Sequence, residues 1–307
     1  MTTTAAPTWQ LVDDPAAFLA LAGDTLRADP ILATVVTTTA QQWVDRAAAG
    51  EPRPDHPCWF AVATDPADAV VGVAMRTAPF EPYPMYVLPM ADDVATSLAD
   101  HLLAHDEHVD AANGSTPAVD VFMRRVAERT GRVAHLDRPT RLYELDTLVP
   151  PAPLPAGQAR PADRDDLDLV VSWLDVFHPE ADRQAGRPDD GTTHPTVHPT
   201  VHPQDVLARL DGRRVWLWEV DGRAVSMVGF QGPALGTARV GPVFTPADQR
   251  GHGYAGALTA HVARELLDRD ARVCLTTDLD NAVSNALYLR LGFRPVGDTA
   301  EMVLAPA

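Results

Sequence analysis

At 307 residues the chain can form one large domain or two of ordinary size, each with its own core. The composition, 46% hydrophobic and 22% charged, is that of a globular protein, and no apolar run approaches the ~20 residues that a membrane-spanning helix needs. A net charge of −17 argues against nucleic acid and anionic membranes as partners, because such a surface repels both.

The N-terminal residues Met1–Gln10 lack a basic segment followed by an apolar one, so no secretory signal is expected. The two cysteines, Cys58 and Cys274, lie far apart and among apolar residues. They are too few for a disulfide framework or a cysteine-based zinc site, and both are interpreted as buried small hydrophobic side chains. A cytoplasmic location without a metal site is the default expectation.

The first half of the chain alternates short apolar runs with helical patterns. Trp59–Thr64 and Val70–Ala74 have strand character and are joined by an Asp-Pro-Ala-Asp turn. The other expected elements are a strand at 85–90, helices at 92–106 and 116–130, and a strand at 141–148.

A proline-rich stretch divides the chain almost in half. Val149–Gln158 reads VPPAPLPAGQ, which cannot lie inside a helix or a central strand. We therefore expect two domains, at residues 1–148 and 159–307, joined by a linker at 149–158.

The second half opens with acidic residues ahead of an amphipathic helical pattern over 163–177. Asp221-Gly222 lies between two strand-like runs and is a strong signal for a type I′ hairpin. The expected elements after the first helix are strands at 215–220, 223–230 and 238–245, a helix at 253–268, a strand at 272–277, a helix at 284–291 and a strand at 293–303. This order predicts a mixed α/β sheet, and the fainter copy of it in the first half suggests an internal duplication.

The strongest chemical signal is Gln249–Ala255, which reads QRGHGYA between a strand and a helix. Glycines allow a tight turn whose N–H groups point inward, and the following helix adds unpaired N–H groups and the positive end of its dipole. With the fixed charge of Arg250, this arrangement is an anion site suited to a pyrophosphate.

The segment resembles the acetyl-CoA signature of the GNAT acetyltransferase superfamily, Gln/Arg-x-x-Gly-x-Gly/Ala, through Arg250, Gly253 and Ala255. Downstream, Asn281, Tyr288 and the pair Gly292-Phe293 match the superfamily pattern of an Asn, a Tyr and a Gly-Phe. The resemblance covers the second half and implies a tandem GNAT-like acyl-CoA N-acyltransferase fold.

The resemblance also implies roles for individual residues. Backbone groups of Val243, Phe244 and Thr245 would pair with the pantetheine arm of acetyl-CoA, as an added strand pairs with a sheet edge. The pyrophosphate would bind to the N–H groups of the turn, namely Gly251, His252, Gly253, Tyr254 and Ala255. Asn281, and more weakly Asn285, would bind the pantetheine, while Asn281 is also a natural helix cap.

Tyr288 would protonate the departing CoA thiolate, and its alternative is a half-buried tyrosine with only a local role. The acceptor amine would attack the thioester directly, since Cys274 lies within an apolar strand and is no exposed nucleophile. Many relatives carry a Glu on the strand before the glycine turn, but 238–245 contains no carboxylate. The candidates for a general base are Glu219, His178, Glu180, Asp278 and a water chain.

Two other segments are expected not to bind a ligand. Residues 193–203 read THPTVHPTVHP; the prolines forbid a helix that would align the histidines, so we expect a loop rather than a metal site. In the first half, Asp92 and Asp93 begin the helix where the glycine turn would lie, and their charges would repel a pyrophosphate. That half is interpreted as a degenerate copy without CoA binding.

The sequence thus predicts an acetyl-CoA-dependent N-acetyltransferase acting on a small-molecule amine. The main alternative is a non-catalytic acyl-CoA-binding sensor or regulatory module, and O-acyl transfer is a further one. The acceptor, the acyl-chain preference and the choice between monomer and homodimer stay open.

Overall fold

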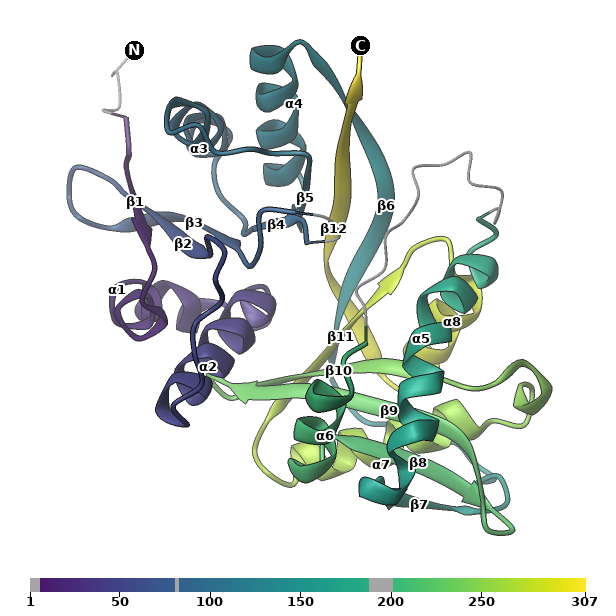
Figure 1. The fold of residues 1–307 in the computed structure, drawn as a ribbon. Helices are drawn as coiled ribbons and strands as arrows, with labels where there is room; N and C mark the ends of the chain where they lie inside the picture. Colours follow the sequence, from purple (N-terminus) through teal and green to yellow (C-terminus); the bar gives the residue numbers. More distant parts are fainter. Residues whose placement is uncertain (1–5, 81–82, 188–200) are drawn as a thin grey trace. The chain divides into compact units, whose positions relative to one another are not determined.

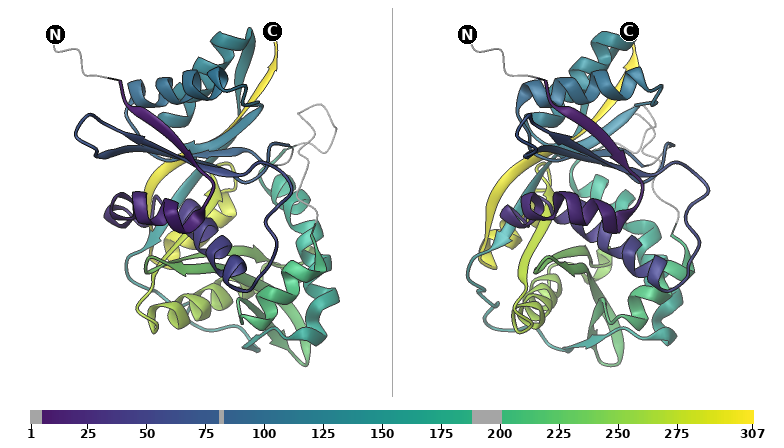
Figure 2. Two further views of the ribbon diagram at one scale, coloured as in Figure 1. Left: turned by 60° about the vertical axis from the view of Figure 1, so that its left-hand side comes forward. Right: turned by 90° about the vertical axis from the view of Figure 1, so that its left-hand side faces the viewer.

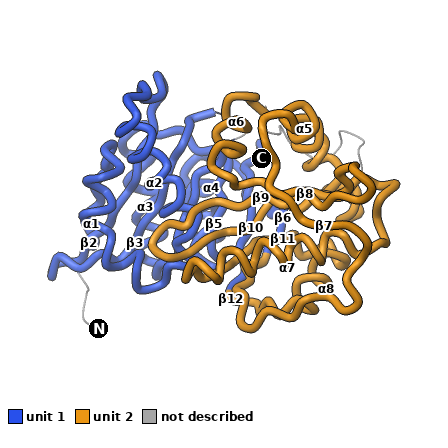
Figure 3. The backbone as a smooth tube through the Cα atoms, turned by 90° about the horizontal axis from the view of Figure 1, so that it is seen from below, with its two compact units in different colours: residues 1–140, 297–307 blue, residues 141–296 orange. Residues whose placement is uncertain are grey.

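The computed structural model describes residues 6–80, 83–187 and 201–307. They form two compact units, coloured separately in Figure 3: unit 1 comprises residues 1–140 and 297–307, and unit 2 comprises residues 141–296. The sequence led us to expect a first domain at 1–148 and a second at 159–307. In the structure unit 1 ends earlier, at residue 140, and the last residues of the chain, 297–307, belong to unit 1 rather than unit 2.

Both units are mixed α/β. Along the first half the elements are β1 (Thr8–Val12), α1 (Pro15–Ala28), α2 (Thr34–Ala48), β2 (Trp59–Thr64), β3 (Val70–Arg76), β4 (Met85–Val87), α3 (Asp92–Ala104), β5 (Ala111–Ser115), α4 (Ala118–Thr130) and β6 (Arg132–Leu145). Along the second half they are β7 (Gln158–Pro161), α5 (Leu167–Gln184), α6 (Pro203–Asp211), β8 (Val215–Val220), β9 (Arg223–Ala234), β10 (Thr237–Phe244), α7 (Tyr254–Leu267), β11 (Arg272–Asp278), α8 (Ala282–Arg290) and β12 (Phe293–Pro306). The second series repeats the order of the first, as the suggested duplication requires.

Each unit receives one strand from the other half of the chain. In unit 1 the strand order is β1-β2-β3-β4-β5-β12, with Thr299–Val303 of β12 antiparallel to β5. In unit 2 the order is β6-β11-β10-β9-β8-β7, and only the last residues of β6 belong to this unit. The strands that end the two series are therefore exchanged, which explains why the domain boundaries differ from those expected from the sequence.

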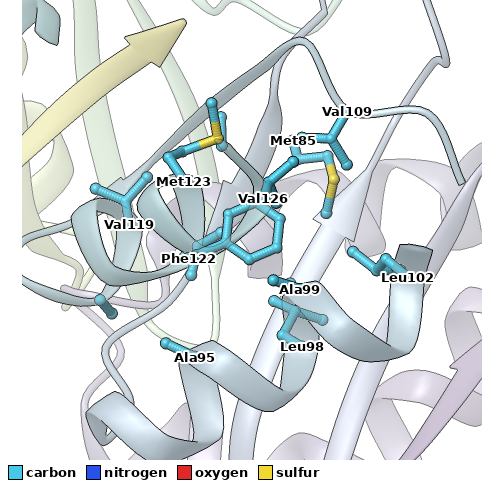
Figure 4. Close-up of a cluster of buried hydrophobic side chains, with 14 of the residues drawn as sticks. Met85, Ala95, Leu98, Ala99, Leu102, Val109, Val119, Phe122, Met123 and Val126 are labelled. Carbon is cyan, nitrogen blue, oxygen red and sulfur yellow. The ribbon is translucent and has the colours of Figure 1, made fainter. Parts of the chain in front are cut away.

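Unit 1 has helices on both faces of its sheet: α1 and α2 cover one face, and α3 and α4 cover the other (Figure 2). Alternation along β2 serves both faces, because Phe60 stacks on Phe18 of α1 while Trp59 and Ala61 join the core beneath α3 and α4. Figure 4 shows that second core, in which Leu98 and Phe122 are fully buried. Burying a side chain of this size stabilises a fold by about 1.5–3 kcal/mol.

Unit 2 also has two layers of helix around its sheet (Figure 1). On one face α7 packs over side chains that include Phe230, Val240 and Val273. On the other face α5 and α6 pack over a smaller cluster that includes Leu217, Met227 and Phe244. The strands of this sheet are buried from both sides, so their sequences are apolar runs rather than alternating ones.

Local signals placed several elements correctly. The predicted hairpin turn is confirmed, since Asp221 (φ 48°) and Gly222 (φ 76°) both have the positive φ of a type I′ turn. The helix predicted to begin near 253 is α7. The expected linker is irregular chain within unit 2, held where the indole N–H of Trp218 donates to the carbonyl of Ala156 at 2.9 Å.

Cys58 and Cys274 are both buried, as predicted. None of the helices in the described ranges is long and apolar enough to cross a membrane.

Candidate active site

The central feature of unit 2 is a fork between two parallel strands. β10 pairs with β11 through Thr237–Arg239 opposite Arg272–Cys274, although β10 continues to Phe244 and β11 to Asp278. Within these fully described strands no pairing follows Arg239, so the backbone of Val243 and Phe244 has no partner on the side of β11. An unpaired strand edge offers backbone donors and acceptors to an extended ligand.

A β-bulge interrupts the regular pairing of β10 with β9 just beyond the point where the fork opens. The register with β9 shifts between Val240 and Val243, and Gly241 in this gap has a φ of 145° that favours glycine. The sequence did predict this strand, but its Gly-Pro pair was not interpreted as a bulge. The bulge separates the half of β10 that pairs with β11 from the half that lines the fork.

The glycine turn connects β10 to α7 and has the open backbone that an anion site requires. Gly251 and Gly253 have φ values of 82° and 84°, and a Cβ added to either would meet nothing within 4 Å. No side chain caps α7. In the described part of the chain, the N–H groups of residues 251–255 donate no hydrogen bond to another residue. Five N–H groups beside a helix N-terminus are thus available for an anion.

Side chains on this turn support its shape. The ring of His252 stacks on that of Tyr254, with centroids 5.3 Å apart, and its Nδ1 lies 3.2 Å from the carbonyl oxygen of Gln249. Thr245, which precedes the turn, shares a hydrogen bond of 2.9 Å between its hydroxyl and that of Ser226. The ends of the turn are therefore fixed while its glycines stay exposed.

Arg250 is held by the protein itself. Its Nε donates to the carbonyl of Thr245 at 3.0 Å, and its terminal nitrogen donates to Glu180 of α5 at 2.7 Å. The hydrogen bond from Arg250 lowers the pKa of Glu180, and Arg183 contributes to the same shift. The sequence singled out Arg250 but could not reveal Glu180 as its partner, because the two lie on separate elements.

The two asparagines lie at the start of α8, near the end of β11. Asn281 is the N-cap: its Oδ1 accepts from the N–H of Ser284 at 3.0 Å, and its Nδ2 lies 3.5 Å from Gln184. Asn285 is engaged on both sides of its amide, since Oδ1 accepts from the Tyr143 hydroxyl and Nδ2 donates to carbonyls that include that of Asp278. These bonds tie α8 to β11 and leave the Asn281 amide less fully committed than that of Asn285.

Tyr288 is the only described residue of α8 that is buried. Its ring meets Phe293 edge-on, with centroids 5.9 Å apart, and its hydroxyl makes no hydrogen bond with any residue of the described ranges. Burial raises the pKa of Tyr288 well above the ordinary value of a phenol, so the group keeps its proton. A protonated phenol without a protein acceptor has the chemistry of a proton donor.

The carboxylates considered as general bases are already paired. Glu219 accepts from Arg160 at 2.7 Å, and Asp278 forms an ion pair with Arg187. Glu180 binds Arg250, as described above, and its lowered pKa makes it a weak base. His178 lies on α5 with its ring 5.1 Å from that of Phe177.

The predicted His-Pro loop lies mostly outside the described residues, His194 and His198 included. His202 immediately precedes α6 as its N-cap residue. The residues that the structure describes contain no group of three or more side chains able to hold a metal ion.

The sequence profile of the Acetyltransferase (GNAT) family matches residues 174–293, which include the fork, the glycine turn and α8. Among curated proteins, no relative matches the chain. Solved structures match nearly its full length. A Drosophila protein is 13% identical with a TM-score of 0.66, covering 98% of this chain and 99% of its own.

Two further structures extend this likeness. A GCN5-related N-acetyltransferase from Sphaerobacter thermophilus is 18% identical with a TM-score of 0.59, covering 97% of this chain and 96% of its own. A tandem GNAT protein from the clavulanic acid biosynthesis pathway is 14% identical with a TM-score of 0.51, covering 97% of this chain and 98% of its own. At these identities the likeness establishes the fold, and the family profile adds the activity class. The second half of the chain therefore matches the GNAT acetyltransferase family over residues 174–293, and the whole chain has the tandem form of that fold.

Proposed function

We propose that unit 2 binds acetyl-CoA and transfers its acetyl group to the amine of a small molecule. The observation that carries this proposal is the fork of β10 and β11 ending in a glycine turn with unpaired N–H groups. Members of the family typically use acetyl-CoA, which has the two features that such a site fits: a peptide-like pantetheine arm and a pyrophosphate.

Each part of the ligand has a complementary part of the chain. The unpaired edge of β10 at Val243, Phe244 and Thr245 is suited to the amides of the pantetheine. The N–H groups of Gly251–Ala255 are suited to the pyrophosphate, with Arg250 positioned by Glu180 at the start of the turn. The amide of Asn281 is the more available of the two asparagines for a further hydrogen bond.

The reaction is a direct transfer within a ternary complex. The amine nitrogen attacks the thioester carbonyl, the C–S bond breaks, an amide forms, and the CoA sulfur takes a proton. Tyr288 supplies that proton, because burial holds its phenol neutral. The proton lost by the amine passes to His178 or to a water chain, since the nearby carboxylates are engaged in ion pairs.

The alternative, a non-catalytic acyl-CoA sensor, requires the same turn but no proton donor. The Tyr288 hydroxyl favours the enzyme, because its pKa is raised and it has no hydrogen-bond partner among the described residues. A purely structural tyrosine would be expected to form a hydrogen bond within the protein. Transfer to a hydroxyl acceptor would use the same groups, and a screen of amines and alcohols separates the two.

The test is calorimetric titration of the full chain with acetyl-CoA, repeated on Gly253→Glu. The added carboxylate would project into open space at the turn and repel the pyrophosphate, so we expect affinity to fall by at least about 100-fold. Gly253→Asn is the matched control, since asparagine tolerates a positive φ without adding charge. Undiminished affinity in Gly253→Glu would contradict the pyrophosphate assignment, and no binding by the wild type would contradict the proposal.

A further inference from the structure

Three arginines gather on one side of the unit 2 sheet without carboxylate partners: Arg209 of α6, Arg214 just before β8, and Arg239 of β10. We refer to them as the arginine cluster. The terminal nitrogen of Arg214 donates to the carbonyl of Ala208 at 3.1 Å. Within the described ranges neither Arg209 nor Arg239 forms a side-chain hydrogen bond or ion pair, and Nε of Arg239 is fully enclosed without a partner.

Other half-buried arginines of unit 2 have carboxylate partners. Arg160 pairs with Asp166, Arg187 with Asp278, and Arg250 with Glu180. The chain has 42 acidic residues for 25 basic ones, so acidic partners are plentiful. An enclosed guanidinium N–H without an acceptor costs free energy, which an incoming anion would recover.

The charges within the cluster act on one another. Burial lowers the pKa of Arg209, the neighbouring charges of Arg214 and Arg239 lower it further, and Asp205 opposes them. Like charges brought together in a partly buried place repel, and one carboxylate does not offset three guanidinium groups. The cluster is therefore electrostatically complementary to an anion.

The position of Arg239 connects the cluster to the candidate active site. Arg239, opposite Cys274, is the last residue of β10 that pairs with β11, so it lies where the fork opens. Its neighbours Ala238 and Val240 face the core beneath α7, and strand alternation directs Arg239 to the face covered by α5 and α6. Arg239 is the one ionisable side chain of β10.

We propose that the arginine cluster binds an anionic oxygen group, a carboxylate or a phosphate, on the acceptor amine. The inference rests on the proposed function for the transfer itself. Binding the anion at the mouth of the fork would orient the amine toward the thioester, and the anion keeps its bonds and charge throughout the reaction.

The first test does not depend on catalysis and uses inorganic phosphate as the probe. Thermal unfolding is measured in chloride and in phosphate at equal ionic strength for the wild type, Arg239→Gln and Arg223→Gln. Arg223 is the matched control, because it is exposed on the same sheet and loses the same charge. Phosphate bound at the glycine turn and its general stabilising effect raise the Tm of all three proteins alike, so we expect the rise in phosphate to be smaller for Arg239→Gln than for the wild type and Arg223→Gln. An equal rise in all three proteins would overturn the proposal.

The same experiment separates a binding role from a structural one. In chloride, Arg239→Gln should unfold at the same temperature as the wild type or above it, because the substitution removes an unpartnered charge. A large drop in Tm in chloride would mean that Arg239 holds the fold together, and would also overturn the proposal.

The second test measures acceptor preference through release of the CoA thiol. Amino acids are compared with their α-amides, and phosphoethanolamine with ethanolamine, so that each pair differs in the anion alone and the two pairs distinguish carboxylate from phosphate. We expect kcat/KM to favour one anionic member by about 10- to 100-fold, and Arg239→Gln to abolish that preference without changing acetyl-CoA affinity.

The two proposals fail in different ways. Normal acetyl-CoA binding with no preference for either anion would overturn the arginine-cluster proposal and leave the proposed function intact. Failure to bind acetyl-CoA would overturn the proposed function, and the phosphate-dependent Tm would still decide whether the cluster binds an anion.

Discussion

The two units repeat one order of elements, yet the corresponding pair of parallel strands is closed in unit 1 and open in unit 2. In unit 1 every residue of β4 pairs with β5, and the backbones approach so closely that a Cβ at Gly114 would lie 2.2 Å from the carbonyl oxygen of Val87. In unit 2 the pairing of β10 and β11 ends at Arg239 and the strands run on unpaired. The repeated fold therefore has an unpaired strand edge only where its parallel strands separate.

The helices that follow these strands differ in the same sense. α3 begins with Asp92 and Asp93, which occupy the positive end of the helix dipole, whereas α7 begins at an uncapped glycine turn. The helix after the next strand differs too: α4 buries an apolar face that includes Phe122 and Val126 (Figure 4), while α8 buries Tyr288. In unit 1 these positions carry two carboxylates and an apolar face, whereas in unit 2 they carry unpaired N–H groups and a buried phenol.

The largest effect is expected from a substitution that tests whether the close pairing of β4 with β5 stabilises unit 1. Gly114→Ala should lower the free energy of unfolding by about 3 kcal/mol, since its Cβ meets backbone rather than a movable side chain. Urea unfolding measures the change, with Gly297→Ala as the control, because its φ suits alanine and its added Cβ would meet only the side chain of Leu32, at 3.4 Å. Acetyl-CoA affinity should stay unchanged; a stable Gly114→Ala variant would mean that the strands of unit 1 part as easily as those of unit 2.

A second substitution sharpens the difference between α4 and α8. Tyr288→Phe should slow acetyl transfer by roughly 100-fold with little change in acetyl-CoA affinity, because it removes the proton donor and keeps the ring. Because burial raises the pKa of Tyr288, wild-type turnover should show no loss from its ionisation up to about pH 10. Single-turnover kinetics measure the rate.

Tyr143→Phe is the matched control for this change. It also removes one phenol hydroxyl from unit 2, but that hydroxyl donates to Asn285 and has a structural role. It should reduce stability and spare the chemical step. Equal rates in Tyr288→Phe and the wild type would remove Tyr288 from the mechanism.

The smallest expected effect concerns the acidic start of α3. The double variant Asp92→Asn, Asp93→Asn should lose about 1 kcal/mol of stability in total, because the carboxylates no longer complement the helix dipole. Calorimetry should still give one acetyl-CoA per chain, since the closed strands of unit 1 offer no free edge. Asp68→Asn, in a turn with φ 62°, controls for the loss of charge; a second bound equivalent in the double variant would mean that the carboxylates alone exclude the ligand.

Sequence patterns correctly predicted several elements that depend mainly on residues close together in the chain. The limits of β2 and β8 were predicted correctly, and the Asp-Gly turn that follows β8 was recognised because it demands positive φ. Three elements near the N-terminus, β1, α1 and α2, were missed although α1 has a clear start signal: Asp14 caps the N–H of Ala17, and Pro15 lies in the first turn. Those signals were present in the sequence and were not used.

Other features arise from contacts that no local pattern encodes. β5 reads AANGS, which has little strand propensity, and it is a strand because β4 and β12 pair with its two edges. The fork, the pairing of Arg250 with Glu180 and the arginine cluster likewise join residues from separate elements. The glycine turn could be predicted from its spacing, but the geometry around it could not.

The exchange of the end strands has a consequence for synthesis of the chain on the ribosome. Ala300, Met302 and Leu304 contribute to the core of unit 1, with the whole of unit 2 between them and β5 in sequence. A nascent chain that has emerged only as far as β6 holds nearly all of unit 1 but leaves the outer edge of β5 uncovered. Unit 1 can complete its fold only after the last residues of the chain have been synthesised. Unit 2 is contiguous in sequence, so during translation it is the first unit that has all of its residues.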